Sequence, residues 1–249
     1  SNVEAQVFLT DPIAGTVFSV TEGEGVYIPG IDGLMPVGSS TEYTIRMVIK
    51  MDRTGGWNRM LNVNHGNDRG LYINGGTIPY PDGRGGSPDF PANEWASLTV
   101  STASNGNTYT YLNGAGRGAW EPAGNWATNM MITSTEMLFF NDNDQDDCNA
   151  GGEHTSLRVK SIVVYDTQLS DEQVAALETA DPVPTPPPPP PACGTDPVAA
   201  YDFSTGTLVS SATCRSAPDM VDVASHCSNV EAQVFLTDPI AGTVFSVTE

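Results

Sequence analysis

The chain has 249 residues, of which 30 are acidic and 10 are basic, so its formal net charge at pH 7 is −20. This excess of negative charge argues against nucleic acid and against an anionic membrane as partners, because both are polyanions. The sequence holds no run of about 18 apolar residues, so it predicts no membrane-spanning segment.

A segment of 22 residues, SNVEAQVFLTDPIAGTVFSVTE, occurs twice, at Ser1–Glu22 and at Ser228–Glu249, without a single substitution. The copies are offset by 227 residues, which we interpret as the period of a tandem array. One such period is long enough for one large β domain and a linker. The chain therefore reads as the end of one repeat followed by the beginning of the next.

Period-two alternation is the dominant local signal after the first copy of the segment. In the stretch 43–50, Tyr43, Ile45, Met47 and Ile49 share one face, as expected of a half-buried strand. Similar short runs follow, separated by turn-rich sequence such as Asn113-Gly114. These predicted strands are Arg59–Val63, Gly70–Ile73, Ala96–Ser101, Asn107–Leu112, Met137–Phe140 and Ser156–Tyr165. Many short strands at this spacing predict an all-β sandwich or jelly roll.

One short helix is predicted near residue 170. Ser170-Asp171-Glu172-Gln173 has the pattern of a capping box, with Ser170 as N-cap and Gln173 at the third helical position. The helix should continue through Val174 and Leu177 and end before Asp181-Pro182, because proline cannot continue it.

A proline-rich run follows the helix and predicts a polyproline II rod. Beyond it, Pro197–Phe203 reads as the first strand of a new unit. A rod of about ten residues spans roughly 30 Å and does not bend back easily, so we expect residues 193–249 to stay off the domain formed by residues 23–180 of the same chain.

The order of the elements resembles the laminin-G-like domains of the concanavalin A-like jelly-roll superfamily. The resemblance is carried by Ala200-Tyr201-Asp202-Phe203, Gly25–Pro29, Tyr43–Lys50, Val159–Tyr165 and Leu169–Leu177, taken in their order within one period. It implies a jelly roll with one short C-terminal helix. The domains are then 1–180, the back part of one repeat's jelly roll; 181–192, a polyproline II linker; and 193–249, the front part of the next repeat's jelly roll.

The proline run also resembles the hydroxyproline-rich surface glycoproteins of algae and plants. That resemblance implies hydroxylation and O-linked sugars, and no Asn-x-Ser/Thr sequon occurs in the chain. The implied modification sites are Pro184, Thr185, Pro186, Pro187, Pro188, Pro189, Pro190 and Pro191.

An acidic loop, residues 141–153, is the candidate metal site. Asp142, Asp144, Asp146 and Glu153 fall at positions 1, 3, 5 and 12, which is the ligand spacing of a calcium loop. Position 6 is Asp147 rather than glycine, and the flanks are predicted strands. The alternatives are therefore a bound calcium ion and a merely solvated acidic loop.

Four cysteines lie in loop sequence without any CxxC spacing, which favours disulfides and an oxidising compartment. We expect Cys214 to pair with Cys227 and Cys148 with Cys193, although four cysteines allow three connectivities.

Aromatic residues give a candidate glycan-binding surface. Trp57, Trp95, Trp120, Trp126 and Tyr80 could stack on sugar rings, or they could fill the edges of the sandwich.

Catalysis has little support, because the chain has neither the Glu-x-Asp-x-Glu triplet of the superfamily's glycosidases nor a Gly-x-Ser-x-Gly elbow. The sequence thus predicts an extracellular, structural tandem-repeat protein that forms a head-to-tail fibre through neighbouring copies of the repeat. The alternative is a carbohydrate-binding adhesin or lectin module, and an enzyme is not expected.

Overall fold

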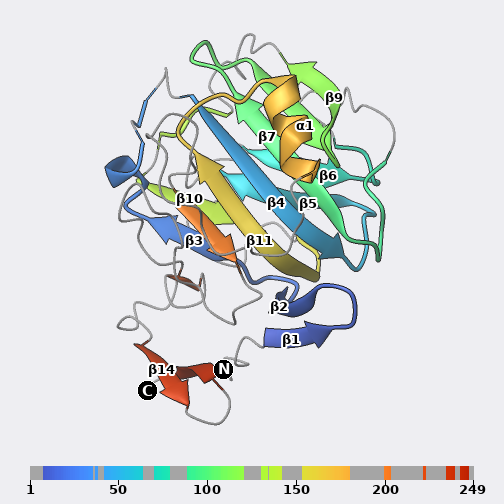
Figure 1. The fold of residues 1–249 in the computed structure, drawn as a ribbon, viewed down its shortest axis with the longest axis vertical. Helices are drawn as coiled ribbons and strands as arrows, with labels where there is room; N and C mark the ends of the chain where they lie inside the picture. Colours follow the sequence, from blue (N-terminus) through green and yellow to red (C-terminus); the bar gives the residue numbers. More distant parts are fainter. Residues whose placement is uncertain are drawn as a thin grey trace.

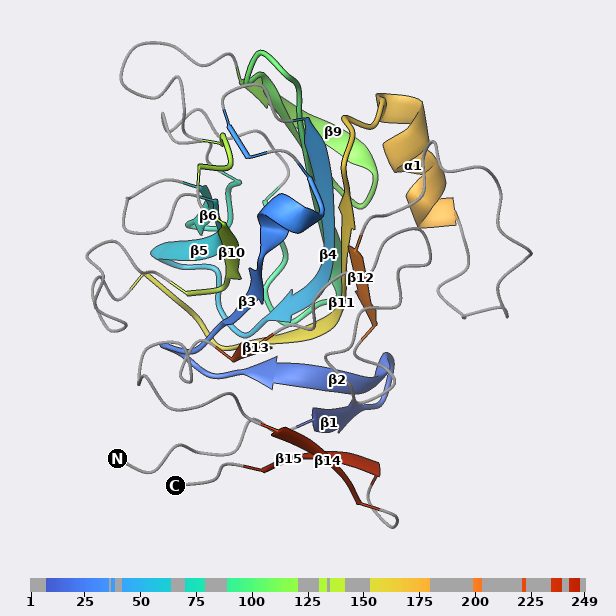
Figure 2. The same cartoon turned by 90° about the vertical axis from the view of Figure 1, so that its left-hand side faces the viewer.

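The computed structural model of the chain describes residues 8–35, 37–38, 42–63, 70–78, 89–120, 130–133, 135–141, 153–179, 199–202, 221–222, 234–238 and 242–246. Within these ranges the chain forms two antiparallel β-sheets that face each other, with one α-helix outside the larger sheet (Figure 1, Figure 2). No helix in the described ranges is long and apolar enough to cross a membrane. The expected all-β sandwich with one short helix is confirmed.

The larger sheet has eight strands in the order β1-β2-β11-β4-β7-β8-β9, and β12 pairs with β11 beside this path. Its strands are β1 (Phe8–Asp11), β2 (Gly15–Val20), β4 (Tyr43–Met51), β7 (Ala96–Thr102), β8 (Thr108–Leu112), β9 (Ala115–Trp120), β11 (Leu157–Tyr165) and β12 (Ala199–Asp202).

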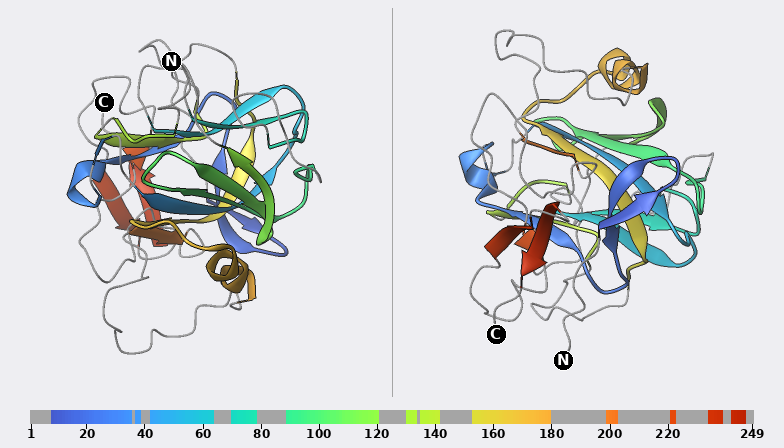
Figure 3. Two further views of the ribbon diagram at one scale, coloured as in Figure 1. Left: turned by 90° about the horizontal axis from the view of Figure 1, so that it is seen from above. Right: turned by 60° about the horizontal axis from the view of Figure 1, so that its bottom comes forward.

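The smaller sheet has five strands in the order β13-β3-β10-β5-β6. Its strands are β3 (Val26–Pro29), β5 (Trp57–Asn62), β6 (Leu71–Asn74), β10 (Glu136–Phe139) and β13 (Val221–Asp222), and a short 3-10 helix, η1 (Ile31–Gly33), follows β3. A separate two-stranded sheet is formed by β14 (Val234–Asp238) and β15 (Gly242–Ser246). Figure 3 shows the two main layers from above and, at the right, turned so that the bottom comes forward.

The main core lies between the two sheets, and the alternation in the sequence explains it. Tyr43, Ile45, Met47 and Ile49 of β4 are buried in one cluster with residues of the facing sheet, such as Phe139 of β10. Of the intervening residues of β4, Arg46, Val48 and Lys50 are only partly buried, whereas Thr44 is buried. Strand β4 lies between β7 and β11 and pairs with both, so the best-patterned strand is also a central one.

The strands predicted from alternation are confirmed to within a few residues at each end. Three other strands of the larger sheet were missed. Strands β1 and β2 lie in the repeated segment, which was interpreted as a repeat and not as a pair of strands. Strand β9 begins Ala115-Gly116-Arg117-Gly118, where the glycines have no side chains that could show alternation. The turn before β9 was expected: Asn113 and Gly114 both have positive φ, 50° and 74°, as a tight hairpin turn requires.

The helix α1 (Asp171–Thr179) begins with the predicted capping box. The Ser170 backbone N–H donates to Gln173 Oε1 at 2.8 Å, and the Gln173 N–H donates to Ser170 Oγ at 3.3 Å. Two backbone donors that a helix start leaves without a partner are thereby satisfied. Below the helix, Val174 and Leu169 pack with Tyr111 and Tyr165 in a second apolar cluster on the outer face of the larger sheet.

The two copies of the repeated segment form the same hairpin. In the first copy Phe8 pairs with Phe18 and Asp11 with Gly15; in the second, Phe235 pairs with Phe245 and Asp238 with Gly242. Corresponding residues are thus in identical register. The copies differ in what lies beside them. Strand β2 pairs with β11, whereas β14 and β15 have a ladder only with each other among the described strands.

The expectation that residues 193–249 stay off the preceding domain is wrong for two strands. Strand β12 pairs with β11, from Ser161 to Val164, and β13 pairs with Val26 and Tyr27 of β3. Strand β2 pairs only with Leu157–Val159, so without β12 the rest of that edge of β11 would keep unpaired backbone groups, and such groups attract another strand. The connection between α1 and β12 has 19 residues and is longer than the proline run, so the chain has enough length to return to β11. The division of the chain into repeats at 180 and 193 stays a prediction.

Candidate functional site

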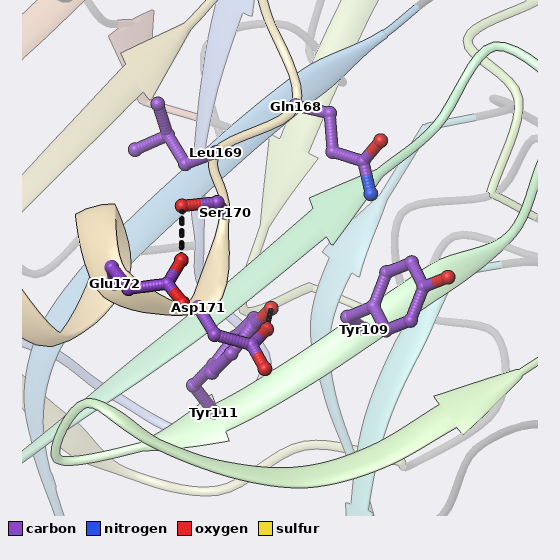
Figure 4. Close-up of a pocket in the computed structure, with 7 residues that line it drawn as sticks. All are labelled: Tyr109, Tyr111, Gln168, Leu169, Ser170, Asp171 and Glu172. Carbon is purple, nitrogen blue, oxygen red and sulfur yellow. Dashed lines mark hydrogen bonds between the residues drawn. The ribbon is translucent and has the colours of Figure 1, made fainter.

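A pocket of about 320 Å³ lies where the start of α1 meets β8, and it is the best-supported candidate site. Two of its walls follow from the sequence of β8, Thr-Tyr-Thr-Tyr-Leu, in which alternation places Tyr109 and Tyr111 on the same outer face. The residues that line the pocket are Tyr109, Tyr111, Gln168, Leu169, Ser170, Asp171 and Glu172 (Figure 4).

The position of α1, and with it the shape of the pocket, is fixed by a partly buried polar contact near its end. Arg46 of β4 donates from Nε and Nη2 to the two carboxylate oxygens of Glu178, at 2.8 and 3.0 Å, and Ser97 Oγ donates to the same carboxylate at 2.7 Å. Burial raises the pKa of Glu178, but these donors outweigh it and hold that pKa below its usual value. Gly114 lies so close to α1 that a Cβ there would be 2.6 Å from Glu178 Cγ.

The segment before α1 is fixed to the sheet by hydroxyl groups. The Leu169 N–H donates to Thr44 Oγ1 at 2.9 Å, and Ser101 Oγ donates to the Leu169 carbonyl oxygen at 3.1 Å. Both backbone groups of Leu169 are therefore hydrogen-bonded, which fixes the positions from which the neighbouring Gln168 and Ser170 side chains extend.

Within the pocket, hydrogen bonds orient two of the polar side chains. Tyr111 Oη donates to Asp171 Oδ1 at 2.7 Å, and Ser170 Oγ donates to Glu172 Oε2 at 2.9 Å. Burial, and then this bond to Asp171, raises the pKa of Tyr111 far above its usual value, so the phenol stays protonated at neutral pH. Figure 4 shows the Gln168 side chain directed toward Tyr109, so that an amide and an aromatic ring border the opening.

This set of groups suits recognition rather than catalysis. An aromatic ring, an amide and two carboxylates can bind a polyhydroxylated ligand by stacking and hydrogen bonding. Acid catalysis by a carboxyl group at neutral pH needs a raised pKa. The pKa of Glu172 is instead lowered, by its own backbone N–H and by the Ser170 hydroxyl.

Most of the residues singled out in the sequence lie outside the described ranges. These are Asp142, Asp144 and Asp146 of the acidic loop, all four cysteines, Pro184–Pro191 with Thr185, Trp126 and Tyr80. Of the acidic loop's expected ligands only Glu153 is described, and its backbone carbonyl oxygen accepts a hydrogen bond from the Arg59 N–H at 2.9 Å. The described residues contain no group of three or more side chains that could hold a metal ion. Calcium, the disulfides and the glycosylation therefore stay predictions.

The candidate aromatic residues have different roles where they are described. Trp95 Nε1 donates to Asp11 Oδ1 at 3.2 Å, so it connects the first copy of the repeated segment to the domain. Trp57 is 42% exposed and packs edge-on against Tyr72, on the smaller sheet and away from the pocket. Trp120 lies in β9, where the backbone alone is described.

Tyr109, Tyr111 and Gln168 were not predicted from the sequence to be site residues. Alternation in the predicted strand 107–112 was a signal that the two tyrosines share a face. Alternation does not show that this face is the outer one or that it lies next to the start of α1. Its position depends on long-range contacts such as that between Arg46 and Glu178, which are 132 residues apart.

Comparison with known proteins shows the fold alone. No protein-family model matches the chain, and no curated protein does. Among solved structures, the binding domain of Paraclostridial Mosquitocidal Protein 1 matches with a TM-score of 0.51 and 12% identity over 71% of this chain. A botulinum neurotoxin type C structure matches with a TM-score of 0.50 and 16% identity, also over 71% of this chain; cell entry of that toxin is described as dependent upon interaction with two ganglioside molecules.

The chain spans about half the length of those structures, 47% of the first and 45% of the second. It thus shares a two-sheet antiparallel β-sandwich fold with those two structures. The likeness is distant, and the laminin-G-like relationship and the tandem repeat remain sequence-based expectations.

Proposed function

We propose that this chain is a non-catalytic carbohydrate-binding module whose binding site is the pocket between β8 and the start of α1. The observation that carries the proposal is the grouping of the Tyr109 ring, the Gln168 amide and the Asp171 carboxylate around one opening of about 320 Å³. Pockets of this size with an aromatic wall and a few oriented polar groups are typical of small-ligand sites.

The fold supports this proposal without establishing it. One structural neighbour quoted above is a binding domain, and cell entry of the other, the type C toxin, depends on interaction with gangliosides, which are glycans on lipid. The superfamily fold hosts many functions, so the function must be argued from the site. Here the Tyr111–Asp171 bond and the capping box position the polar groups before any ligand arrives, which lowers the entropic cost of binding.

The experiment is a screen of the intact chain against immobilised neutral oligosaccharides, followed by titration calorimetry with the best ligand in solution. Tyr109→Ala should weaken binding at least about tenfold, because it removes the stacking surface. Trp57→Ala is the matched control, since Trp57 is an exposed aromatic residue on the other sheet, and it should leave binding unchanged. The proposal fails if no oligosaccharide binds, or if Tyr109→Ala binds as tightly as the unaltered chain.

A second candidate function is the head-to-tail structural array, which the repeated segment favours. The observation is that both copies form a hairpin in identical register, so either copy has the backbone shape that the β11 edge accepts. In an array the second copy would be the first hairpin of the next domain, and neighbouring repeats would be the partners. An extracellular location, disulfides, calcium and O-glycosylated prolines all fit such an array and remain proposals with it.

The array is tested on the native protein by electron microscopy and by its mass under reducing, denaturing conditions. Filaments together with a covalent mass of many periods would support it. Discrete monomers of a single period would exclude it.

A further inference from the structure

We propose a second ligand site, for a sugar that carries a carboxylate or sulfate group, in the groove between the first copy of the repeated segment and the outer face of β4 and β11. The groove has a volume of about 320 Å³ and is lined by Leu9, Thr10, Asp11, Pro12, Lys50 and Arg158. This site goes beyond the proposed function, because it shares no residue with the Tyr109 pocket and could bind its ligand whether or not that pocket binds one.

Two cations meet in this groove because of the sheet register. Lys50 of β4 lies directly opposite Arg158 of β11, so the two basic side chains leave neighbouring positions on the same face. Like charges directly opposite each other are unfavourable unless an anion joins them. The chain has only 10 basic residues against 30 acidic ones, which makes this pair unusual on its surface.

The existing counter-charges leave both cations able to accept a ligand. Lys50 Nζ lies 3.7 Å from Asp11 Oδ2, and Arg158 Nη1 lies 3.8 Å from Asp52 Oδ1. Both separations exceed hydrogen-bonding distance, and the Asp52 side chain is 46% exposed, so its attraction is weakened by solvent. Lysine has three N–H donors and arginine five, which is enough for these pairs and for an incoming anion.

Asp11 is a fixed part of the groove rather than a competitor for the ligand. Its Oδ1 accepts hydrogen bonds from the Ile13 and Ala14 N–H groups at 2.8 and 3.0 Å, and from Trp95 Nε1 at 3.2 Å. Burial raises the pKa of Asp11, but these donors and Lys50 outweigh it and hold the pKa below its usual value. The ionised carboxylate thereby orients Lys50 at the edge of the groove.

The lining also contains two apolar residues, which point to a sugar rather than a bare ion. Leu9, which is 37% exposed, and Pro12 line the groove beside Thr10. An acidic pyranose has an apolar C–H face for these two residues and a charged group for Lys50 and Arg158. Apolar lining with a few charged groups that fix orientation is the usual composition of such sites.

The first copy of the repeated segment supplies four of the six lining residues, Leu9–Pro12. The same four residue types recur at 236–239, but Lys50 and Arg158 lie outside the repeated segment and occur once in this chain. The site therefore exists once per domain, and only where a copy of the hairpin is docked on β11.

In the test, the full chain is titrated with methyl β-D-glucuronide and, as the neutral match, with methyl β-D-glucoside. Binding is monitored through the amide chemical shifts in NMR spectra. The glucuronide should shift resonances of Leu9–Pro12 and of β11 around Arg158, and it should bind at least about tenfold more tightly than the glucoside. Lys50→Gln and Arg158→Gln should each weaken glucuronide binding about tenfold, while Lys160→Gln, a charge change on the same strand outside the lining, should not. Equal melting temperatures would show that the variants fold.

Any of the following three outcomes would overturn the proposal. Equal binding of the two glycosides, or unchanged binding by Lys50→Gln and Arg158→Gln, would show that the cations do not recognise the ligand. Inorganic sulfate binding as tightly as the glucuronide would show an anion site without sugar recognition. Loss of glucuronide binding in Tyr109→Ala but not in Arg158→Gln would assign the ligand to the first pocket, which supports the proposed function and contradicts this second site.

Discussion

The two copies of the repeated segment have one sequence and one hairpin register but different surroundings. In the first copy Val17, Phe18 and Val20 are buried in the domain, and the Phe8 and Phe18 rings are 5.6 Å apart between centroids. The second copy forms a two-stranded sheet of its own. Local sequence thus decides that a hairpin forms and in which register, whereas the open edge of β11 decides which hairpin becomes part of the domain.

This difference has an energetic consequence. An isolated two-stranded hairpin is marginal in water, since most of the stability of a strand comes from the neighbours on which it packs. Identical substitutions in the two copies therefore act as controls for each other. The chemical change and the local sequence are the same, and only the tertiary surroundings differ.

The largest effect is expected for the phenylalanine that faces the core. Phe18→Ala should lower the free energy of unfolding by about 3–5 kcal/mol, because it leaves a cavity at a fully buried side chain. Phe245→Ala should lower it by less than about 0.5 kcal/mol. Urea denaturation of the two variants measures both values, and equal losses would contradict the different placement of the copies.

A smaller effect, dependent on pH, is expected for the aspartate. Asp11→Asn should cost about 1–2 kcal/mol at neutral pH, because the charge that accepts three N–H donors is lost. The pKa of Asp11 is lowered from 3.8, so its stabilisation is present above that value and disappears as the pH falls through the folded-state pKa. The variant and the unaltered chain should therefore converge in stability well below pH 3.8.

The matched variant Asp238→Asn should follow the unaltered chain at every pH. Denaturant midpoints recorded across the acid range separate these results. A constant gap between Asp11→Asn and the unaltered chain down to the lowest pH would show that the Asp11 charge is not the cause.

The smallest effect is expected at the hairpin turn. Gly15 has a φ of 74°, and no other group lies within 4 Å of the position that a Cβ would occupy there. Gly15→Ala should therefore cost only the strain of the left-handed backbone, about 1 kcal/mol. Gly242→Ala in the second copy should leave the melting temperature of the domain unchanged. A loss of several kcal/mol for Gly15→Ala would mean that the turn makes contacts that the structure does not contain.

The parts of the fold that could be predicted from the sequence depend on short-range patterns. The alternation of Tyr43 to Ile49 predicted β4, and the spacing of Ser170 and Gln173 predicted the start of α1, because both signals are complete within a few residues. Strand β9 was missed because its glycines leave too few side chains to show alternation.

The candidate sites could not be assembled in this way. The Tyr109 pocket depends on α1 folding over β8, and the groove at Lys50 depends on a hairpin whose Asp11 reaches Trp95, 84 residues away. For Trp95, the choice between a sugar platform and a residue that fills the edge of the sandwich stayed open, because a tryptophan in the sequence does not reveal the partner of its N–H group. The return of β12 to β11 was missed because the stiffness of the proline run was weighed without the open edge that attracts the strand.

Amide hydrogen exchange, followed by NMR on the intact chain, tests most directly the claim that the same hairpin is part of the domain only where it is docked on β11. The sequences of 15–20 and 242–247 correspond, so their intrinsic exchange rates match and any difference reports protection alone. The amides of Phe18 and Ser19 should exchange at the rate of global unfolding, and those of Phe245 and Ser246 several orders of magnitude faster. Equal protection of the two copies would contradict the account.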